Sequence, residues 1–323
     1  MWKPTPSVSQ RLILANNMAQ APHLPVLYKT IITALQPKNF GRYIDGTLGA
    51  AGHATGILTE AAPQGELLGF DLDPQALAIA REKLAPFGER AHIIQASYTT
   101  MKEAAANLGW DAVDGIVLDF GVSSMQLDTP ERGFSFLTDG PLDMRFSPKA
   151  GMSAAEMVNT FDEADLADII FRYGEDRSAR RIARSIVGNR PFESTKQLAD
   201  LILKSVGRPE RIHPATRTFQ ALRIAVNGEL DSIETVIPIA VSLLKPGGRL
   251  AAISFHSLED RIVKEYFRRE SRDCICPPRQ PICTCGHKAS IIEINRKPIE
   301  ATEEEIQENS RARSAKLRVA EKI

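Results

Sequence analysis

Residues 43 to 53 of this 323-residue chain read Tyr43-Ile44-Asp45-Gly46-Thr47-Leu48-Gly49-Ala50-Ala51-Gly52-His53. They predict a short apolar strand, an acidic residue at its end, and glycines three residues apart that open a helix. Glycine permits a tight turn and lets a large ligand lie against bare backbone. The stretch therefore predicts a ligand-binding loop at the end of a strand.

A second predicted strand, residues 67–70, ends at Asp71. An acidic side chain at this distance from a glycine-rich loop commonly accepts hydrogen bonds from the two hydroxyls of a ribose. We therefore expect a cofactor that contains a nucleoside. Asp73 has a different explanation, because Asp73-Pro74 is typical of a helix N-cap followed by proline at the first helical position.

The composition is that of a globular protein, with 43% hydrophobic and 25% charged residues and a formal net charge of zero. No global charge attracts the chain to nucleic acid. No apolar run approaches the roughly 20 residues that span a bilayer, and Leu12-Ile13-Leu14 is too short for the core of a signal peptide. We expect a cytoplasmic protein whose residues 1–22 form a flexible tail.

Strands and helices alternate from residue 23 to 125, which predicts an α/β fold with a parallel, doubly wound sheet. The predicted helices are 28–35, 53–61 and 74–84, and further strands are 92–95 and 115–119. The pattern resumes with a long helix at 229–244, a turn at Lys245-Pro246-Gly247-Gly248 and a strand at 249–255. Two final strands, 290–295 and 315–320, surround a helix at 302–309.

Between these halves the pattern changes. Residues 126–150 are rich in proline and glycine, and residues 153–227 read as helices with caps at Ser153, Asp162 and Ser194. Residues 172–223 contain 12 Lys/Arg against 5 Asp/Glu. We predict a discontinuous domain, 23–125 and 228–323, interrupted by an inserted loop and helical substrate-recognition domain, 126–227.

Three predicted strands end in a carboxylate, at Asp45, Asp71 and Asp119. Ligands of open parallel sheets bind outside the carboxyl ends of the strands, so we expect one shared pocket. Asp45 would face a positively charged part of the ligand and Asp71 the ribose. Asp119 would lie where the chemistry occurs, and Tyr98 would stack on an adenine.

Two ligand classes fit such a pocket, a dinucleotide and S-adenosylmethionine. A dinucleotide normally requires G-x-G-x-x-G for its pyrophosphate, whereas Gly46, Gly49 and Gly52 lack the close first pair. Asp45 would repel a pyrophosphate but attract an amino group or a sulfonium. Methyl transfer is therefore favoured, and a dinucleotide-dependent oxidoreductase is the alternative.

Several long motifs together resemble one family, the bacterial 16S ribosomal RNA (cytosine-N4)-methyltransferases, called RsmH or MraW. The resemblance runs in order from about His23 to the C-terminus. The motifs are Asp45-Gly46-Thr47-x-Gly49, Asp119-x-Gly121-Val122-Ser123-Ser124-x-Gln126-Leu127-Asp128, Glu131-Arg132-Gly133-Phe134-Ser135-Phe136, Asp139-Gly140-Pro141-Leu142-Asp143-Met144-Arg145, His213-Pro214-Ala215-Thr216-Arg217-Thr218-Phe219-Gln220 and Ser254-Phe255-His256-Ser257-Leu258-Glu259-Asp260-Arg261.

The resemblance implies a class I (Rossmann-like) S-adenosylmethionine-dependent methyltransferase that modifies a cytidine in the decoding centre of the small ribosomal subunit. A non-catalytic RNA-binding assembly factor on the same fold is a further alternative. Ala51 replaces a glycine common in the family, and Tyr98 replaces a frequent phenylalanine. With the residues read above, the expected cofactor contacts are Asp45, Gly46, Gly49, Ala51, Gly52, His53, Asp71, Tyr98, Asp119 and Gln126.

Asp119 is the first candidate for the proton acceptor, with Ser123 or Ser124 beside it and His256 as a second polar candidate. The loop from Arg132 to Arg145 is a candidate lid over a base extruded from its stack. The expected substrate contacts are Arg132, Phe134, Asp143, Arg145 and Arg217, and Arg172, Arg177, Arg180, Arg181 and Arg184 are candidates for phosphate contacts or form a solvated face. The oligomeric state stays open, a dimer included.

All four cysteines lie close together, as Cys274-Ile275-Cys276 and Cys283-Thr284-Cys285. A local cluster in a cytosolic chain indicates a metal rather than disulfides. Four thiolates are suited to tetrahedral zinc, although C-x-C is tighter than the usual C-x-x-C. Zinc and reduced thiols in a proline-rich loop both remain open.

Overall fold

The computed structural model describes residues 25–148, 151–207, 212–280 and 282–323, so the predicted tail at 1–22 lies outside the described residues. Its centre is an eight-stranded sheet with strand order β3-β2-β1-β4-β5-β8-β6, and β7 pairs with β8. The strands from β3 to β5 are parallel, and β8 runs antiparallel to β5, β6 and β7. The strands are β1 (Arg42–Asp45), β2 (Glu66–Asp71), β3 (Ala91–Gln95), β4 (Val113–Asp119), β5 (Leu244–Ser254), β6 (Ile291–Glu293), β7 (Ile299–Glu300) and β8 (Lys316–Lys322).

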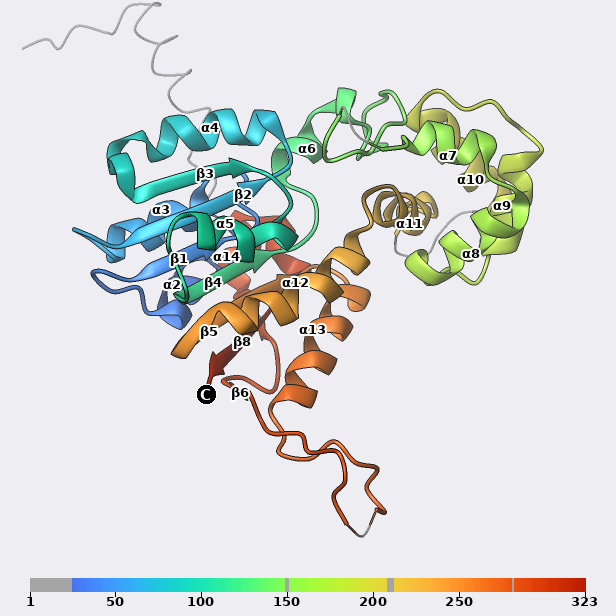
Figure 1. Ribbon diagram of the computed structural model, residues 1–323. Coiled ribbons are helices and arrows are strands. Elements are labelled where there is room, and N and C mark those ends of the chain that lie inside the picture. The colour runs from blue at the N-terminus through green and yellow to red at the C-terminus, as the bar shows by residue number, and fades with distance from the viewer. Residues whose placement is uncertain (1–24, 149–150, 208–211, 281) are drawn as a thin grey trace, which may run out of the picture.

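Helices cover both faces of this sheet, and a group of helices stands beside it (Figure 1). The sheet-covering helices are α2 (Tyr28–Leu35), α3 (Gly52–Glu60), α4 (Pro74–Leu84), α5 (Met101–Asn107), α12 (Glu229–Leu243) and α13 (Ser257–Glu270), and α14 (Glu303–Glu308) lies near the C-terminus. The others are α6 (Ser124–Asp128), α7 (Ala154–Thr160), α8 (Glu163–Gly174), α9 (Ala179–Val187), α10 (Thr195–Val206) and α11 (Ala215–Asn227).

Side chains alternate between the two faces of each strand, which gives the sheet a separate core on each side. Tyr43 packs in the core formed with α2, α3 and α4, whereas its neighbour Ile44 packs in the core formed with α5, α12 and α13. Leu67 and Leu68 divide in the same way. The predicted α/β class with a doubly wound parallel sheet is therefore confirmed.

The predicted helix at 28–35 and the Asp73-capped helix at 74–84 have the observed bounds. Several details differ from the predictions. The expected turn at 245–248 belongs to β5, where the register against β4 shifts from Val113↔Leu244 to Gly115↔Arg249 so that the extra residues bulge. The predictions also omitted β7 and the 14-residue helix α13, which begins after His256.

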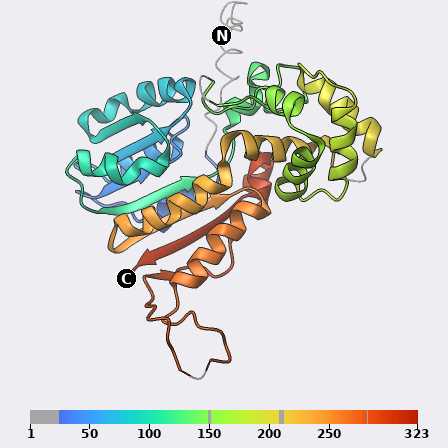
Figure 2. The ribbon, with the colours of Figure 1, turned by 45° about the vertical axis from the view of Figure 1, so that its right-hand side comes forward.

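The segment between β4 and α12 forms its own apolar core, built from residues 134 to 222. Ser153, Asp162 and Ser194 cap α7, α8 and α10 as predicted. Figure 2 shows these helices beside the carboxyl ends of the strands, joined to the sheet through α6 and α12. We retain the division into a discontinuous domain and an insert at 126–227 as a proposal.

Within the described ranges, none of the helices is long and apolar enough to cross a bilayer.

A buried ion pair links the antiparallel strand β8 to α13. Arg318 donates to both carboxylate oxygens of Asp260, at 2.7 and 3.2 Å, and to the carbonyl oxygen of Arg296. Arg318 is 4% exposed and Asp260 8%. Water therefore screens this pair poorly, and each charge depends on the other.

Arg318→Ala should lower the free energy of unfolding by about 3 to 5 kcal/mol, because it leaves the carboxylate of Asp260 buried without its partner. Urea denaturation measures this change. Exposed Arg313 supplies the control, since Arg313→Ala should change stability by less than about 0.5 kcal/mol. Equal effects of the two substitutions would contradict the assigned role of the pair.

Candidate functional site

The loop after β1 lies across the ends of the two neighbouring strands. The backbone N–H of Gly46 donates to Val117 at 3.0 Å, and that of Leu48 donates to Phe70 at 2.8 Å. The Thr47 hydroxyl accepts from the N–H of Asp119 at 2.7 Å. These bonds bring the ends of β1, β2 and β4 together at one edge of the sheet.

Asp71 holds the glycine loop in place from the end of β2. Its Oδ2 accepts from the N–H of Gly49 at 2.8 Å, and its Oδ1 accepts from the N–H of Asp73 at 2.8 Å. Gly49 has φ +50°, a conformation that glycine adopts without steric cost. Burial raises the pKa of Asp71. Each of its oxygens keeps a second lone pair for a ligand hydroxyl.

Asp45 is the most deeply buried of the three strand-end carboxylates, at 1% exposure. Its Oδ1 accepts from the N–H of Thr47 at 3.1 Å, whereas its Oδ2 has no hydrogen-bond partner. Burial and, to a smaller extent, the nearby charge of Asp71 together raise the pKa of Asp45 to about 7, although backbone hydrogen bonds act to lower it. A buried carboxylate oxygen without a donor is costly unless a ligand supplies one.

Asp119 lies at the opening of the site. Its Oδ1 is buried without a hydrogen-bond partner, while 24% of its side chain stays exposed. Burial raises the pKa of Asp119 well above its ordinary value, and Asp45 and Glu259 add repulsion. Asp119 thus combines access to a ligand with an unusual affinity for a proton.

His53 lies behind Asp119 and is neutral. Its Nε2 donates to the carbonyl oxygen of Val26 at 3.1 Å, which leaves Nδ1 as an acceptor at 3.9 Å from Asp119 Oδ2. Burial lowers the pKa of His53 to about 4. His53 therefore adds no positive charge to the acidic cluster, and its side chain is buried, with 4% exposure of the residue.

A small cavity of about 40 Å³ lies beside the end of β4, with Phe120 and Gly121 in its wall. Tyr98, the aromatic predicted to stack on an adenine, also lines it, and the rings of Tyr98 and Phe120 pack edge to face with centroids 6.3 Å apart. The lining residues are Thr47, Tyr98, Phe120, Gly121, Phe146, Glu229 and Ile233.

Sequence reasoning missed a group of paired charges near this cavity, of which Glu229 lines it. Arg223 on α11 donates to both oxygens of Glu229 at 2.8 and 2.9 Å, and it lies 3.9 Å from Glu259. Glu259 is fully buried and accepts from the N–H of Phe255 at 2.7 Å. The signal for Glu259 was present, because His256-x-x-Glu259 forms a capping box at the start of α13.

Gln126 and Arg132 have structural contacts here. Gln126 Oε1 accepts from the N–H of Ser123, and its Nε2 donates to Asp73 Oδ2 at 3.0 Å. Arg132 donates to the same oxygen of Asp73 and to the carbonyl oxygens of Arg145 and Phe146, both at 2.9 Å. These bonds fasten the candidate lid to the start of α4. Contacts of Gln126 with cofactor and of Arg132 with substrate stay predictions.

The other expected substrate contacts divide into two groups. Phe134 is 7% exposed and stacks on Phe146, so it belongs to the core of the insert. Arg145 and Asp143 are half-exposed near the lid and pair with each other at 2.6 Å, while Arg217 is exposed and donates to the carbonyl oxygen of Glu175. The structure does not bring Arg217 into the strand-end cluster.

Ser123 caps α6, with its Oγ accepting from the N–H of Gln126 at 3.3 Å. Ser124, the first residue of that helix, is half-buried. Both hydroxyls therefore lie at the end of the loop that follows Asp119, where α6 begins.

Ala51 occupies the left-handed conformation, with φ 57°, at the N-cap of α3. Its methyl group is fully buried, so it does not narrow the approach of a ligand to the loop. Gly46 has a different constraint, because a Cβ there would lie 2.4 Å from Leu118. The loop therefore excludes larger side chains at Gly46 and tolerates alanine at position 51.

The four cysteines also come together, with all Sγ atoms within 4.8 Å of one another. They lie in the loop after α13, whereas the strand-end cluster lies before that helix.

Taken together, the edge of the sheet presents buried carboxylates with free lone pairs, an open backbone loop and a small aromatic-lined cavity. Negative charge in a poorly hydrated site stabilises a cation and repels an anion. The arrangement therefore suits a positively charged ligand that also carries a ribose.

Asp45→Asn should remove a pH dependence of stability. Because the pKa of Asp45 is about 7 in the native state and that of an ordinary aspartate is 3.8, the native state keeps a proton that the unfolded state releases. Its contribution to stability is present below about pH 4 and is lost as the pH rises toward 7. As the pH rises from about 5.5 to about 8, the free energy of unfolding of Asp45→Asn should increase by about 2 kcal/mol relative to that of the parent protein. Parallel urea-denaturation profiles of the two proteins would contradict this.

Comparison with known proteins shows the family of this chain. The model of the MraW methylase family matches residues 20–323. A "Ribosomal RNA small subunit methyltransferase H" from Dehalococcoides mccartyi is 52% identical over 307 residues, covering 95% of this chain and 88% of that protein. Proteins of the same name from Geobacter sp. strain M21 and Heliobacterium mobile are 54% and 48% identical, each covering 93% of this chain and 98% and 99% of their own lengths. The chain belongs to the MraW methylase family.

Proposed function

We propose that this protein is a small-subunit ribosomal RNA methyltransferase that transfers a methyl group from S-adenosylmethionine to the exocyclic N4 of a cytidine in the decoding centre of 16S rRNA. The observation that carries the proposal is the pair of buried, unpartnered oxygens, Asp45 Oδ2 and Asp119 Oδ1, at the end of the parallel sheet. Family membership and the relatives named above supply the substrate class.

The cofactor fits the donors and charges of this site. S-adenosylmethionine carries an ammonium and a sulfonium, and both are cations that buried carboxylates stabilise. Asp45 is suited to the ammonium, and Asp71 to the ribose hydroxyls through its free lone pairs. Tyr98 and Phe120 offer apolar surface for the adenine. The loop from Gly46 to Gly52 offers bare backbone.

S-adenosylmethionine supplies an electrophilic methyl group when it is bound. The amine of cytosine is a weak nucleophile because its lone pair is conjugated into the ring, so alignment provides much of the rate enhancement. As the N–C bond forms, the S–C bond breaks with its electron pair on sulfur, and the nitrogen must lose a proton. Asp119 is the group suited to accept that proton, since its side chain is partly exposed and its pKa is raised well above that of an ordinary carboxylate.

The base has to leave its stack to reach Asp119. The lid fastened by Arg132 to Asp73 lies beside the site, and Phe146, the residue after the lid, lines the cavity. Because Tyr98 and Phe120 of that cavity are assigned to the adenine, we propose that the lid itself covers the extruded base. Asp143 and Arg145, which are half-exposed on the same loop, remain proposed substrate contacts.

The insert is suited to hold the RNA backbone. The side of α9 opposite its core carries Arg180, Arg181 and Arg184, all exposed. In the part of the chain that the structure describes, Arg180 and Arg181 form no ion pair, whereas Arg184 pairs with Glu163 at 3.4 Å. Exposed arginines without an ion-pair partner are suited to contact phosphates. Such contacts give affinity for RNA without distinguishing one base sequence from another.

The alternatives fit less well. A dinucleotide would bring a pyrophosphate against three carboxylates, and the match to a methylase family is a further argument against an oxidoreductase. A non-catalytic assembly factor would not need Asp119 to be both basic and accessible. We propose a cytoplasmic location and an assembled or partly assembled small subunit as the partner.

Asp119→Ala should abolish methylation, and Asp119→Asn should lower kcat by about 10² to 10⁴ because the amide cannot accept the proton. Methyl incorporation from labelled S-adenosylmethionine into small subunits of cells lacking the protein measures the effect. Exposed Asp111 lies just before β4, away from the end of that strand, so Asp111→Ala is the control and should retain most activity. Near-normal turnover of Asp119→Ala would refute the role of Asp119, and absence of incorporation by the parent protein would favour the assembly factor.

Arg180→Ala combined with Arg181→Ala should weaken RNA binding at all sequences. The slope of log affinity against log salt should become shallower by about 1.5, because two phosphate contacts are lost. Filter binding over a salt series measures this slope. Replacing exposed Arg81 and Lys83 on α4 removes the same charge elsewhere and should leave the slope unchanged. Equal slopes for both pairs would assign the arginines of α9 to a solvated face.

A further inference from the structure

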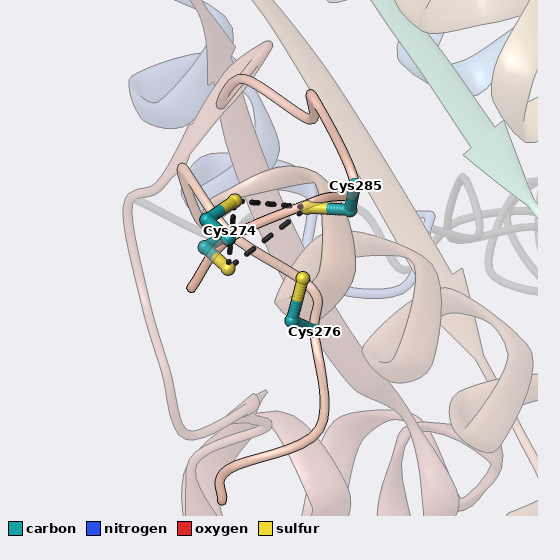
Figure 3. A group of neighbouring side chains, drawn as sticks. Cys274, Cys276 and Cys285 are labelled. Carbon is teal, nitrogen blue, oxygen red and sulfur yellow. Dashed lines mark hydrogen bonds between the residues drawn. The ribbon is translucent and has the colours of Figure 1, made fainter. Parts of the chain in front are cut away.

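The four cysteines converge on one point in the loop between α13 and β6. Cys274 Sγ lies 3.5 Å from Cys283 Sγ and 3.9 Å from Cys285 Sγ, and Cys283 and Cys285 are 3.6 Å apart. In Figure 3 the side chains of Cys274, Cys276 and Cys285 turn toward a common centre from two segments of the loop.

These separations match the geometry of a tetrahedral metal thiolate. With Zn–S bonds of about 2.3 Å, the sulfurs at the corners of a tetrahedron lie about 3.8 Å apart. The three distances above surround that value. They are far longer than the roughly 2.05 Å of a disulfide bond. Cys283 is also close to both Cys274 and Cys285, so no single pairing of thiols is favoured.

Backbone donors already point at the sulfurs. The N–H of Ile275 donates to Cys285 Sγ and the N–H of Thr284 donates to Cys276 Sγ, each at 3.5 Å. Each C-x-C pair thus supplies a donor to a sulfur of the other pair. Such outer hydrogen bonds orient metal ligands and stabilise their negative charge.

Apolar packing contributes little to the shape of this loop. Ile275 and Ile282 are 44% and 75% exposed, and the described residues from 274 to 287 form no helix or strand. A short segment without an apolar core normally requires a cross-link or a metal. His287 is engaged elsewhere, because its Nε2 lies 3.2 Å from the carbonyl oxygen of Arg269.

The charge of the residues around the loop also favours a metal bound by four thiolates. Residues 268–288 contain five Lys/Arg and two Asp/Glu, a net charge of about +3 that offsets the −2 of a zinc ion with four thiolates.

We propose that Cys274, Cys276, Cys283 and Cys285 bind one Zn²⁺ as a structural site. The ion would replace the thiol protons and fasten the two sides of the loop to each other. Catalysis is not its role, because α13, with 14 residues, separates the loop from the strand-end cluster by about 20 Å. Four protein ligands leave no open position for a substrate.

The test uses the untagged full-length protein, purified with reductant and dialysed against Zn²⁺. Elemental analysis should find about one zinc per chain. A thiol-specific mercurial should release that zinc as it titrates four thiols, which are all the cysteines of the chain. Cobalt substitution should give the strong visible absorption of tetrahedral thiolate coordination.

Cys276→Ser should bind zinc far more weakly and should leave S-adenosylmethionine binding unchanged, since the site lies at the other end of α13. Thr284→Ala keeps all four thiols and the backbone donor, so it is the matched control and should retain zinc. A reduced parent protein that binds no zinc, or one whose four thiols form two disulfides in intact-mass analysis, would overturn the proposal.

Discussion

The main energetic constraint on this structure is the burial of several carboxylates together at one poorly hydrated end of a parallel sheet. Their mutual repulsion and loss of hydration cost stability, and the surrounding segments have to hold them in place. Asp45, Asp71 and Asp119 end neighbouring strands, and burial raises the pKa of each. Backbone N–H groups donate one hydrogen bond to each oxygen of Asp71 but leave one oxygen each of Asp45 and Asp119 without a partner. A fold that retains such groups gives up stability that a cationic ligand can restore.

The rest of the molecule holds that edge in place. On one side Asp73 joins the start of α4 to Gln126 and Arg132 of the lid. On the other, the Arg223–Glu229 pair joins the insert to α12 beside the cavity. The insert therefore meets the site through paired charges on both sides. This arrangement supports the proposal that the helical segment between β4 and α12 holds RNA beside a pocket built by the sheet.

Local patterns predicted the sheet well. Strand-end carboxylates, the Asp73-Pro74 cap and apolar alternation all act over a few residues, and each was found where expected. Contacts between distant segments were less predictable. Nothing near Arg132 in the sequence indicates that it forms an ion pair with Asp73, 59 residues away. Nothing there indicates that Phe134 packs inside the insert either. Helix α13 was omitted although His256 and Glu259 form its capping box, because histidine is an unusual cap.

The most direct test of the cation-binding claim is the proton balance of cofactor binding. Calorimetric titrations with S-adenosylmethionine near pH 6.5, in buffers of different ionisation enthalpy, measure how many protons are released. Because a bound cation lowers the pKa values of Asp45 and Asp119, binding should release protons, and Asp45→Asn should release fewer. Binding without proton release, or heat from NAD in place of S-adenosylmethionine, would contradict the account.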